Sequence, residues 1–381
     1  MKNKFILIIM YVLMFLSLDL FSQAPCVNPV VINDPLVANA DYNHALRLLD
    51  ARCAWTITRG SRDIIVGVVD TEFDTLHEDL RHTFARIGGL GTNTFSHGTA
   101  VASCVATGTN NGIGIAAIGY NTRVNGYRVV SSGGSASEAA IWSAVYEAYR
   151  DGIKIINVSW ASVGASRSQI QQMVNDGVVL VVAAGDNPST FHQAYADIPG
   201  VINVSGVDAT NHHGPTGNAS NAWVDVCVLS RQVANCRPGN QYQVDQGAFT
   251  SFAAPQVAGV VALMRSVNPN LTPPQVENIL KETTDRIPDD HLFLGNPKPG
   301  RVNAFRALRR TLCTLPSSGR TFSGTVTTDS IVNGNNVHIS NNITVRPGGH
   351  LRVNACNSVT ITSGNITVEP GGTLDISVYG P

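Results

Sequence analysis

Short, nearly continuous apolar runs recur along the first two thirds of the chain. The run 64–69 ends at Asp70, and a run of this length is typical of a strand buried on both faces of a parallel sheet. Comparable runs follow at 124–130, 153–158, 178–184 and 201–204, and helical stretches fall at 97–107, 135–149, 166–175, 253–265 and 275–283. This alternation predicts an α/β fold, with a parallel β-sheet sandwiched by helices and ligands bound beyond the carboxyl ends of the strands.

From residue 316 onward the chain is rich in Thr, Val, Asn, Ser and Gly and shows no helical periodicity. It contains an internal repeat, because the segment 342–351 returns as 365–374 at an offset of 23 residues. β-branched residues that alternate between Pro-Gly-Gly turns are typical of stacked β-rungs. The pattern predicts a small β-rich, β-solenoid-like C-terminal region, for which a passive spacer and a binding module are both open.

The first 24 residues have the pattern of a secretory signal peptide. A short basic segment precedes an apolar run of about 14 residues, which is shorter than the roughly 20 residues that span a bilayer. Small residues follow, so cleavage is expected after Ala24 or Ser22. We therefore expect a signal at 1–24, one large domain at 25–315 and a repeat tail at 316–381. The mature chain would be secreted, or extracytoplasmic, without a membrane span.

Export permits disulfides, and the seven cysteines are an odd number. Cys104 lies in an apolar run of small residues and is expected to be a buried free thiol. Among the remaining six, closeness in sequence favours Cys26–Cys53 and Cys227–Cys236, which leaves Cys313–Cys356. No spacing is that of zinc ligands, so these cysteines are expected to act as structural cross-links.

Composition excludes some classes of function but does not indicate a particular reaction. The 26 Lys and Arg nearly balance the 27 Asp and Glu, which leaves a net charge of −1. Neither half of the chain is basic, which argues against nucleic acid or an anionic membrane as the main partner. Hydrophobic residues make up 43% of the chain, which allows a sizeable core and excludes a disordered protein.

Three polar residues at the ends of predicted elements form a candidate nucleophilic relay. Asp70 follows the first apolar run, His97 opens a predicted helix, and Ser251 stands at a loop-to-helix junction. Each has an ordinary alternative when taken singly: a loop carboxylate, a surface histidine or a helix N-cap. Together, the imidazole can accept the hydroxyl proton while the carboxylate fixes its tautomer. The chain order Asp, His, Ser is one in which this relay occurs.

The motifs around these residues resemble those of the subtilisin-like serine proteases. Val-Val-Asp-Thr at 68–71, His-Gly-Thr-Ala-Val-Ala at 97–102 and Thr-Ser-Phe-Ala-Ala-Pro at 250–255 match the family's three motifs. The resemblance extends over about residues 49–308. It implies a subtilisin-like fold and a serine endopeptidase that cleaves protein or peptide substrates through an acyl-enzyme, with no cofactor needed for the chemistry. We expect a monomer.

The resemblance also implies where a peptide substrate binds. Two extended segments would pair with it by β-augmentation, and the family's Ala-Ala-Gly segment would lie beside them. In one of the two, Ala161 stands where the family usually has Gly. The expected substrate-binding residues are Ser131, Ser132, Gly133, Ser159, Trp160, Ala161, Ala184 and Gly185.

A second implied site is a calcium loop. The segment 110–115 resembles the family's calcium-binding loop, and Asp79 matches a carboxylate ligand. Hard oxygen donors of this kind suit a structural Ca²⁺. The expected ligands are Asp79, Asn111, Ile113 and Ile115. The loop is one residue longer than the family pattern, and a glycine-rich turn without a metal is the alternative.

One departure from the family bears directly on catalysis. The family stabilises the oxyanion with the side-chain amide of an Asn after Ala-Ala-Gly, whereas here Asp186 follows Gly185 and Asn187 comes one position later. Loss of such a donor costs roughly 10²–10³ in rate. Three alternatives follow: a protonated Asp186 donates, Asn187 enters the oxyanion hole, or the chain is a catalytically impaired binding module.

Other departures leave the three relay residues in place. They are Glu72, Ala100, Phe249 and Gln256. Phe249 stands where the family has a Gly that could adopt a positive φ or permit close packing. A lipase or esterase is disfavoured, because no Gly-x-Ser-x-Gly surrounds Ser251 and that class places its nucleophile first along the chain.

Overall fold

The computed structural model describes residues 26, 28–88, 97–129, 136–160, 166–187, 195–213, 219–363 and 366–380. The chain divides into two compact units, which we call the sandwich unit and the repeat unit. The sandwich unit is Val30–Thr311. The repeat unit is Leu312–Pro381 together with the N-terminal residues up to Pro29.

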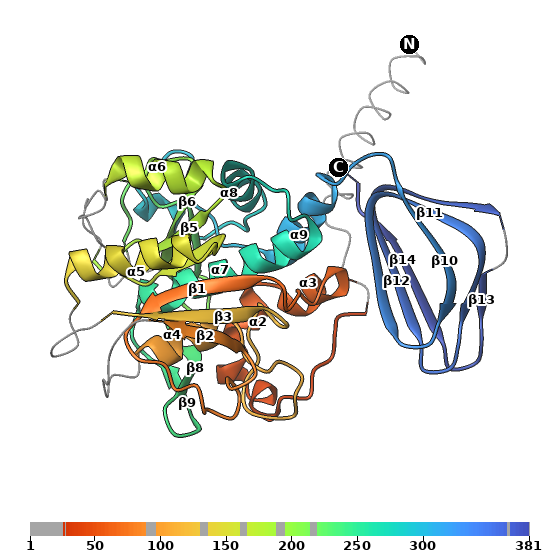
Figure 1. The fold of residues 1–381 in the computed structure, drawn as a ribbon, viewed down its shortest axis with the longest axis horizontal. Coiled ribbons are helices and arrows are strands. Elements are labelled where there is room, and N and C mark those ends of the chain that lie inside the picture. The colour runs from red at the N-terminus through yellow and green to blue at the C-terminus, as the bar shows by residue number, and fades with distance from the viewer. Residues whose placement is uncertain are drawn as a thin grey trace, which may run out of the picture. The chain divides into compact units, whose positions relative to one another are not determined.

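A seven-stranded parallel sheet forms the centre of the sandwich unit (Figure 1). Its spatial order is β2-β3-β1-β4-β5-β6-β7. The strands are β1 (Ile65–Asp70), β2 (Phe84–Gly88), β3 (Arg123–Arg128), β4 (Ile155–Val158), β5 (Val179–Ala183), β6 (Val201–Val207) and β7 (Val226–Leu229). Every residue of β4, β5, β6 and β7 is buried, which explains the continuous apolar runs. The predicted α/β fold is confirmed.

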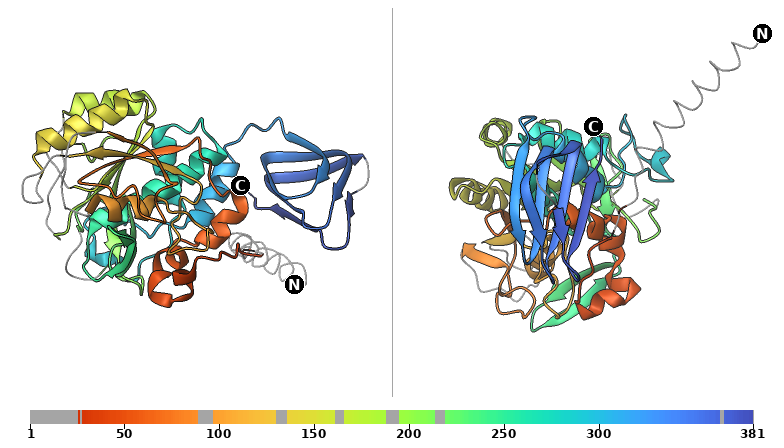
Figure 2. Two further views of the ribbon diagram at one scale, coloured as in Figure 1. Left: turned by 60° about the horizontal axis from the view of Figure 1, so that its bottom comes forward. Right: turned by 90° about the vertical axis from the view of Figure 1, so that its right-hand side faces the viewer.

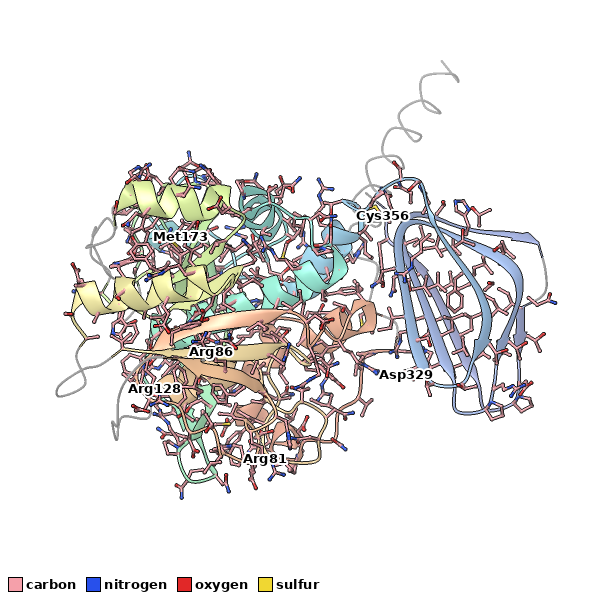
Figure 3. All side chains as sticks on the ribbon, in the orientation of Figure 1. Arg81, Arg86, Arg128, Met173, Asp329 and Cys356 are labelled. Atoms are coloured by element: carbon pink, nitrogen blue, oxygen red, sulfur yellow. A yellow bond between two sulfur atoms is a disulfide. The ribbon has the colours of Figure 1, made fainter. Side chains whose placement is uncertain are left out.

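Helices cover both faces of this sheet (Figure 2). On one face, α5 (Glu138–Arg150) and α6 (Arg167–Asn175) share one apolar cluster with the strands, and Met173 of α6 lies fully buried in it (Figure 3). On the other, α7 (Thr250–Val267) packs against the strands and against α4 (His97–Val105). The remaining helical segments are η1 (Pro35–Ala38), η2 (Ala40–Tyr42), α2 (His44–Leu48), α3 (Ala51–Ile57), α8 (Pro273–Glu282), η3 (Asp290–Leu292) and α9 (Ala304–Leu312).

A hairpin that the apolar pattern does not predict lies between β7 and α7. Strands β8 (Val233–Arg237) and β9 (Gln241–Asp245) pair antiparallel in a separate two-stranded sheet. Strand β9 is short, polar and partly exposed, so it lacks the continuous apolar run by which the buried strands are recognised.

The repeat unit is a curled sheet of parallel strands. Its strands are β10 (Arg320–Val326), β11 (Asp329–Val345), β12 (His350–Ser363), β13 (Ile366–Val368) and β14 (Thr373–Val378). β12 pairs with β14 from His350↔Thr373 to Ala355↔Val378, a register of 23 residues that equals the sequence repeat. Inward-facing apolar residues of successive coils build one core. The β-rich C-terminal region predicted from the repeat is therefore present.

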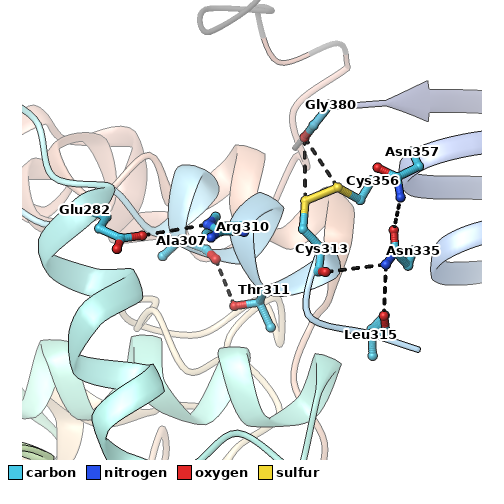
Figure 4. Close-up of a disulfide and its surroundings, with 10 residues drawn as sticks. All are labelled: Glu282, Ala307, Arg310, Thr311, Cys313, Leu315, Asn335, Cys356, Asn357 and Gly380. Atoms are coloured by element: carbon cyan, nitrogen blue, oxygen red, sulfur yellow. Dashed lines mark hydrogen bonds and ion pairs between the residues drawn. A yellow bond between two sulfur atoms is a disulfide. The ribbon is translucent and has the colours of Figure 1, made fainter. Parts of the chain in front are cut away.

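The cysteines follow the sequence expectation in part. Cys313 and Cys356 form a disulfide within the repeat unit (Figure 4), Cys26 and Cys53 are each disulfide-bonded, and Cys104 is a buried free thiol. The expected Cys227–Cys236 pair is wrong, because both are buried free thiols. Cys227 packs in a cluster with Val207 and Phe293, whereas Cys236 packs with Leu80 and Ile115. Nearness in sequence misled here, because the two strands direct the thiols into different cores.

Among the described residues, no helix combines the length and apolar character needed to cross a bilayer.

Candidate active site

Asp70 is the last residue of β1 and is fully buried. Its Oδ1 accepts hydrogen bonds from the backbone N–H of Thr71 at 2.7 Å and from the Thr71 hydroxyl at 3.2 Å. A carboxylate at the carboxyl end of a buried parallel strand is thereby held in one orientation. This is the position in which ligands and reacting groups collect in such sheets.

His97 and Ser251 complete a continuous hydrogen-bonded chain with Asp70. His97 begins α4, and its Nδ1 lies 2.8 Å from Oδ1 and 3.1 Å from Oδ2 of Asp70. Its Nε2 lies 3.1 Å from Oγ of Ser251, the second residue of α7. Because Nδ1 must donate to the carboxylate, Nε2 is left to accept from the hydroxyl.

The residue after His97 must be small for this contact to form. A Cβ on Gly98 would lie 2.6 Å from the backbone oxygen of Glu72 and 3.3 Å from Cβ of Asp70. The backbone N–H of Gly98 also donates to the Thr71 hydroxyl at 3.0 Å. The absence of a side chain on Gly98 therefore lets the start of α4 pack directly against the end of β1. This close approach brings the His97 imidazole within hydrogen-bond distance of the Asp70 carboxylate.

The pKa of His97 is raised above its ordinary value by its surroundings. Burial of the imidazole acts to lower the pKa, but the charge of Asp70 and the hydrogen bond to it raise it by more. Arg237 opposes this effect and Asp186 adds to it at smaller magnitude. The site thus favours the imidazolium, which is the form that appears once a hydroxyl proton has been transferred.

Ser159 connects the end of β4 to α7, the helix that carries Ser251. Its hydroxyl donates to the carbonyl of Ser251 at 2.8 Å and accepts from Nδ2 of Asn157 at 2.9 Å. The half-buried Trp160 places its ring centroid 6.4 Å from that of His97. These two of the expected substrate-binding residues lie beside the relay. Ser131, Ser132, Gly133 and Ala161 lie outside the described residues.

Asp186 contacts the start of α7. Its Oδ1 accepts from the backbone N–H of Thr250 at 2.6 Å and from the Thr250 hydroxyl at 2.8 Å. That hydroxyl in turn accepts from the N–H of Gly185 at 3.1 Å, and Gly185 adopts a φ of +106°. Asp186 therefore binds the first N–H group of the helix that carries Ser251, a favourable place for a carboxylate. Asn187 is exposed, and Ala184 is buried beneath the loop.

The role of Thr250 was not expected from the sequence. It lies in the serine motif, yet only the fold shows that its hydroxyl and N–H connect Asp186 to α7. The sequence does place a Thr directly before the candidate nucleophile, at the start of a helix. A Thr in such a position often hydrogen-bonds to groups at the helix N-terminus.

The loop expected to bind calcium is satisfied by its own hydrogen bonds. Oδ1 of Asp79 accepts from Nδ2 of Asn111 at 3.0 Å, and Oδ2 accepts from the N–H of Ile115 at 2.9 Å. Oδ1 of Asn111 accepts from the N–H of Ile113 at 2.8 Å, so turning the amide over would set two donors against each other. Burial raises the pKa of Asp79 to about 6. In this arrangement two N–H donors face the carboxylate of Asp79, so the loop is held together by its own hydrogen bonds.

The departures from the family motifs have local explanations. Phe249 has a φ of −121°, so no positive φ is needed there, and its exposed ring lies over Gly247. Glu72 forms an ion pair with Arg128 at 3.6 Å. Gln256 is buried and donates to the carbonyls of Leu229 and Phe252 at 2.7 Å each. Ala100 is fully buried in α4.

Comparisons with known proteins agree on one family. Residues 61–296 match the model of the subtilase family, peptidase class S8. A thermophilic serine proteinase of Bacillus sp. strain AK1 is 31% identical over 67% of this chain and 64% of the relative. Thermitase of Thermoactinomyces vulgaris is 28% identical over 73% of this chain and 99% of its own length. The chain thus spans slightly under two thirds of the first of these relatives.

A solved structure shares the same fold. A protease from Pseudoalteromonas arctica aligns with a TM-score of 0.60 and 26% sequence identity, over 74% of this chain and 100% of that chain.

Proposed function

This chain belongs to the subtilase family, and on that premise we propose that it is an exported serine endopeptidase with Ser251 as its nucleophile. The observation that carries the proposal is the unbroken chain of hydrogen bonds from Asp70 through His97 to Ser251. β1, α4 and α7 are far apart in sequence, yet each contributes one residue to this chain of hydrogen bonds. A structural role alone gives no reason for these three residues to meet.

The proposed reaction begins when Oγ of Ser251 attacks the carbonyl carbon of a peptide bond. His97 Nε2 accepts the hydroxyl proton, and Asp70 stabilises the imidazolium that forms. Collapse of the tetrahedral intermediate breaks the C–N bond as His97 returns the proton to the departing amine. Water then attacks the acyl-enzyme, with His97 again as base, and releases the carboxylic acid product.

The side chain beside the oxyanion position is where this chain departs most clearly from the family motif. The backbone N–H of Ser251 can donate to the oxyanion, but the neighbouring side chain is a carboxylate whose Oδ1 is already occupied by Thr250. We propose that Asp186 serves chiefly to fix the start of α7 and thus the position of Ser251. It could donate to the oxyanion only through a proton on Oδ2. A catalytically impaired binding module is the second candidate, and Asp186 is the observation that favours it.

Peptide substrates follow from the family, and we propose that they bind in extended form beside Ser159 and Trp160. The segment 131–133 would form the opposite side. We further propose that residues 1–24 direct export, which is compatible with the disulfide Cys313–Cys356.

Labelling with a fluorophosphonate probe tests the proposal directly. The folded chain should form a covalent adduct that maps to Ser251 and is absent from Ser251→Ala. Hydrolysis of peptide amides, measured in parallel, separates the two candidates. An adduct with turnover supports the endopeptidase, an adduct with negligible turnover supports the impaired module, and no adduct on folded protein refutes the nucleophile assignment.

A further inference from the structure

The carbonyl group of Ser251 cannot form the usual hydrogen bond within α7. In an α-helix each carbonyl accepts from the N–H four residues further along, and that residue here is Pro255, which has no N–H. The proline ring also crowds the carbonyl four residues before it. The backbone at the proposed nucleophile therefore needs a donor from outside its own helix.

That donor comes from the end of β4. The hydroxyl of Ser159 donates to the carbonyl of Ser251 at 2.8 Å, and Ser159 is buried. A hydroxyl has one proton and can also accept, so it can turn among several partners unless a neighbour fixes it. Asn157 is fully buried and donates from Nδ2 to the Ser159 oxygen at 2.9 Å. This bond uses the hydroxyl oxygen as an acceptor and leaves its proton directed to the Ser251 carbonyl.

The strand beside β4 carries the carboxylate of the relay. β1 and β4 are paired, with Val69 in register with Val158. Asp70 follows the first of these two residues, and Ser159 follows the second. One strand end therefore orients the imidazole, and the adjacent strand end holds the backbone of the nucleophile. The register of the sheet sets the spacing between the two.

We propose that Ser159 is a positioning residue for catalysis and that Asn157 orients its hydroxyl. The proposal rests on the assignment of Ser251 as the nucleophile. Asp186 binds the N–H of Thr250 at the start of α7, and Ser159 binds the carbonyl of the next residue. The short stretch of backbone that carries Oγ is thus held at two points by side chains from outside the helix, which fixes Oγ relative to the imidazole.

This role differs from substrate binding. An extended substrate would pair with the backbone of the segment that contains Ser159, whereas the hydroxyl is engaged with Ser251. Loss of the hydroxyl should therefore lower kcat and leave KM close to that of the wild type. Because a misplacement of about 1 Å costs roughly 10² in rate, Ser159→Ala should lower kcat by roughly 10-fold to 10²-fold. The rate of fluorophosphonate labelling, measured on every variant, should fall in parallel.

Pro255→Ala should rescue this loss. Alanine provides an N–H four residues after Ser251, so the carbonyl regains a helical donor and no longer depends on the hydroxyl. In the Pro255→Ala background, Ser159→Ala should therefore lower kcat and the labelling rate much less than it does in the wild type. The four proteins of this double-mutant cycle account for any effect of Pro255→Ala alone.

The matched control is Ser266→Ala. Ser266 lies near the other end of α7, where its hydroxyl donates to the carbonyl of Leu263 at 2.7 Å and bonds to the hydroxyl of Thr58 at 2.9 Å. The variant loses bonds of the same kind from the same helix, so its melting temperature should fall much as that of Ser159→Ala does. Its kcat and labelling rate should not change.

The possible failures can be told apart. If the folded wild type forms no adduct, the nucleophile assignment is wrong and this proposal fails with it. If the wild type forms the adduct but Ser159→Ala is labelled equally fast, the positioning role alone is wrong. A loss that appears in KM, that Ser266→Ala reproduces, or that is undiminished in the Pro255→Ala background would also overturn the positioning role.

Discussion

The sandwich unit and the repeat unit differ in how far apart in sequence their contacting residues lie. In the sandwich unit, residues separated by 27 and 154 positions meet at the end of a strand, as Asp70, His97 and Ser251 do. In the repeat unit, residues about 21–23 positions apart stack on one another, and each coil depends on the next. The first arrangement brings distant residues to one site, whereas the second repeats the same contact at a fixed spacing.

This difference determines where each unit is sensitive to change. The sandwich unit tolerates little change at the few polar ends of its strands, because one misplaced group there breaks the relay. A stack of coils is modular, so the effect of a substitution depends on whether another coil covers it. The two units should therefore respond to substitution independently, and the following predictions test that independence.

The largest effect is expected for Ser251→Ala. Removal of the proposed nucleophile should lower kcat for peptide-amide hydrolysis by about 10⁶, as the loss of one member of such a relay does. The thermal unfolding of the repeat unit should not change. Residual activity within tenfold of the wild type in purified protein would show that another residue carries the reaction.

Asp186→Asn should raise kcat by roughly 10²–10³, because the new amide can donate to the oxyanion. The substitution is nearly isosteric, and its Oδ1 can still accept both hydrogen bonds from Thr250. The comparison with Asp186→Ala separates the two roles, since Ala loses the contact with α7 as well and should lower kcat. An unchanged or lower kcat for Asn would mean that Asp186 is already adapted to catalysis.

Ile339→Ala and Ile361→Ala form a matched pair within one register of the repeat unit. Ile339 is fully buried, so its truncation should cost about 2–5 kcal/mol of unfolding free energy. Ile361 is 53% exposed, so the same change should cost about 1 kcal/mol in dilute protein. Chemical denaturation followed at a probe in the repeat unit measures both. Equal costs would contradict the difference in burial between the two positions.

The smallest expected effect is on the pH dependence of kcat/KM. The relay needs neutral His97, whose pKa is raised above 6.5, chiefly because Asp70 outweighs the effect of burial. The acidic limb of kcat/KM should therefore have its midpoint above 6.5, with activity lost as the pH falls through it. Asp186→Asn should move the midpoint down, because the negative charge of Asp186 adds to the shift. A midpoint below 6.5 in the wild type would contradict the raised pKa.

Local sequence patterns were sufficient to predict much of the structure of this protein. Continuous apolar runs predicted the buried parallel strands, because a strand covered on both faces has no polar side. The 23-residue repeat predicted stacked rungs, because identical turns set identical spacing. The positions of Asp70, His97 and Ser251 at element boundaries marked them as candidates before any contact was known.

Other features depended on contacts between distant segments. The predicted Cys227–Cys236 disulfide was wrong because β7 and β8, although consecutive in sequence, direct the two thiols into different cores. The donors around Asp79 and the contact between Asp186 and Thr250 depend on loop conformations that composition does not specify. Ile361 and Ile376 are partly exposed although their register partners Ile339 and Val353 are fully buried, and the sequence context of both pairs is similar.

The amino-acid sequence by itself therefore determined the strand and helix alternation, the repeat and the candidate relay, because periodicity and short motifs are local properties. Only the tertiary structure decided which thiols stay free, that Asp186 binds the start of α7, and how deeply each apolar position of the repeat is buried. Those outcomes depend on three-dimensional proximity, and a hydrogen bond or a buried contact forms only where the fold brings two distant segments together.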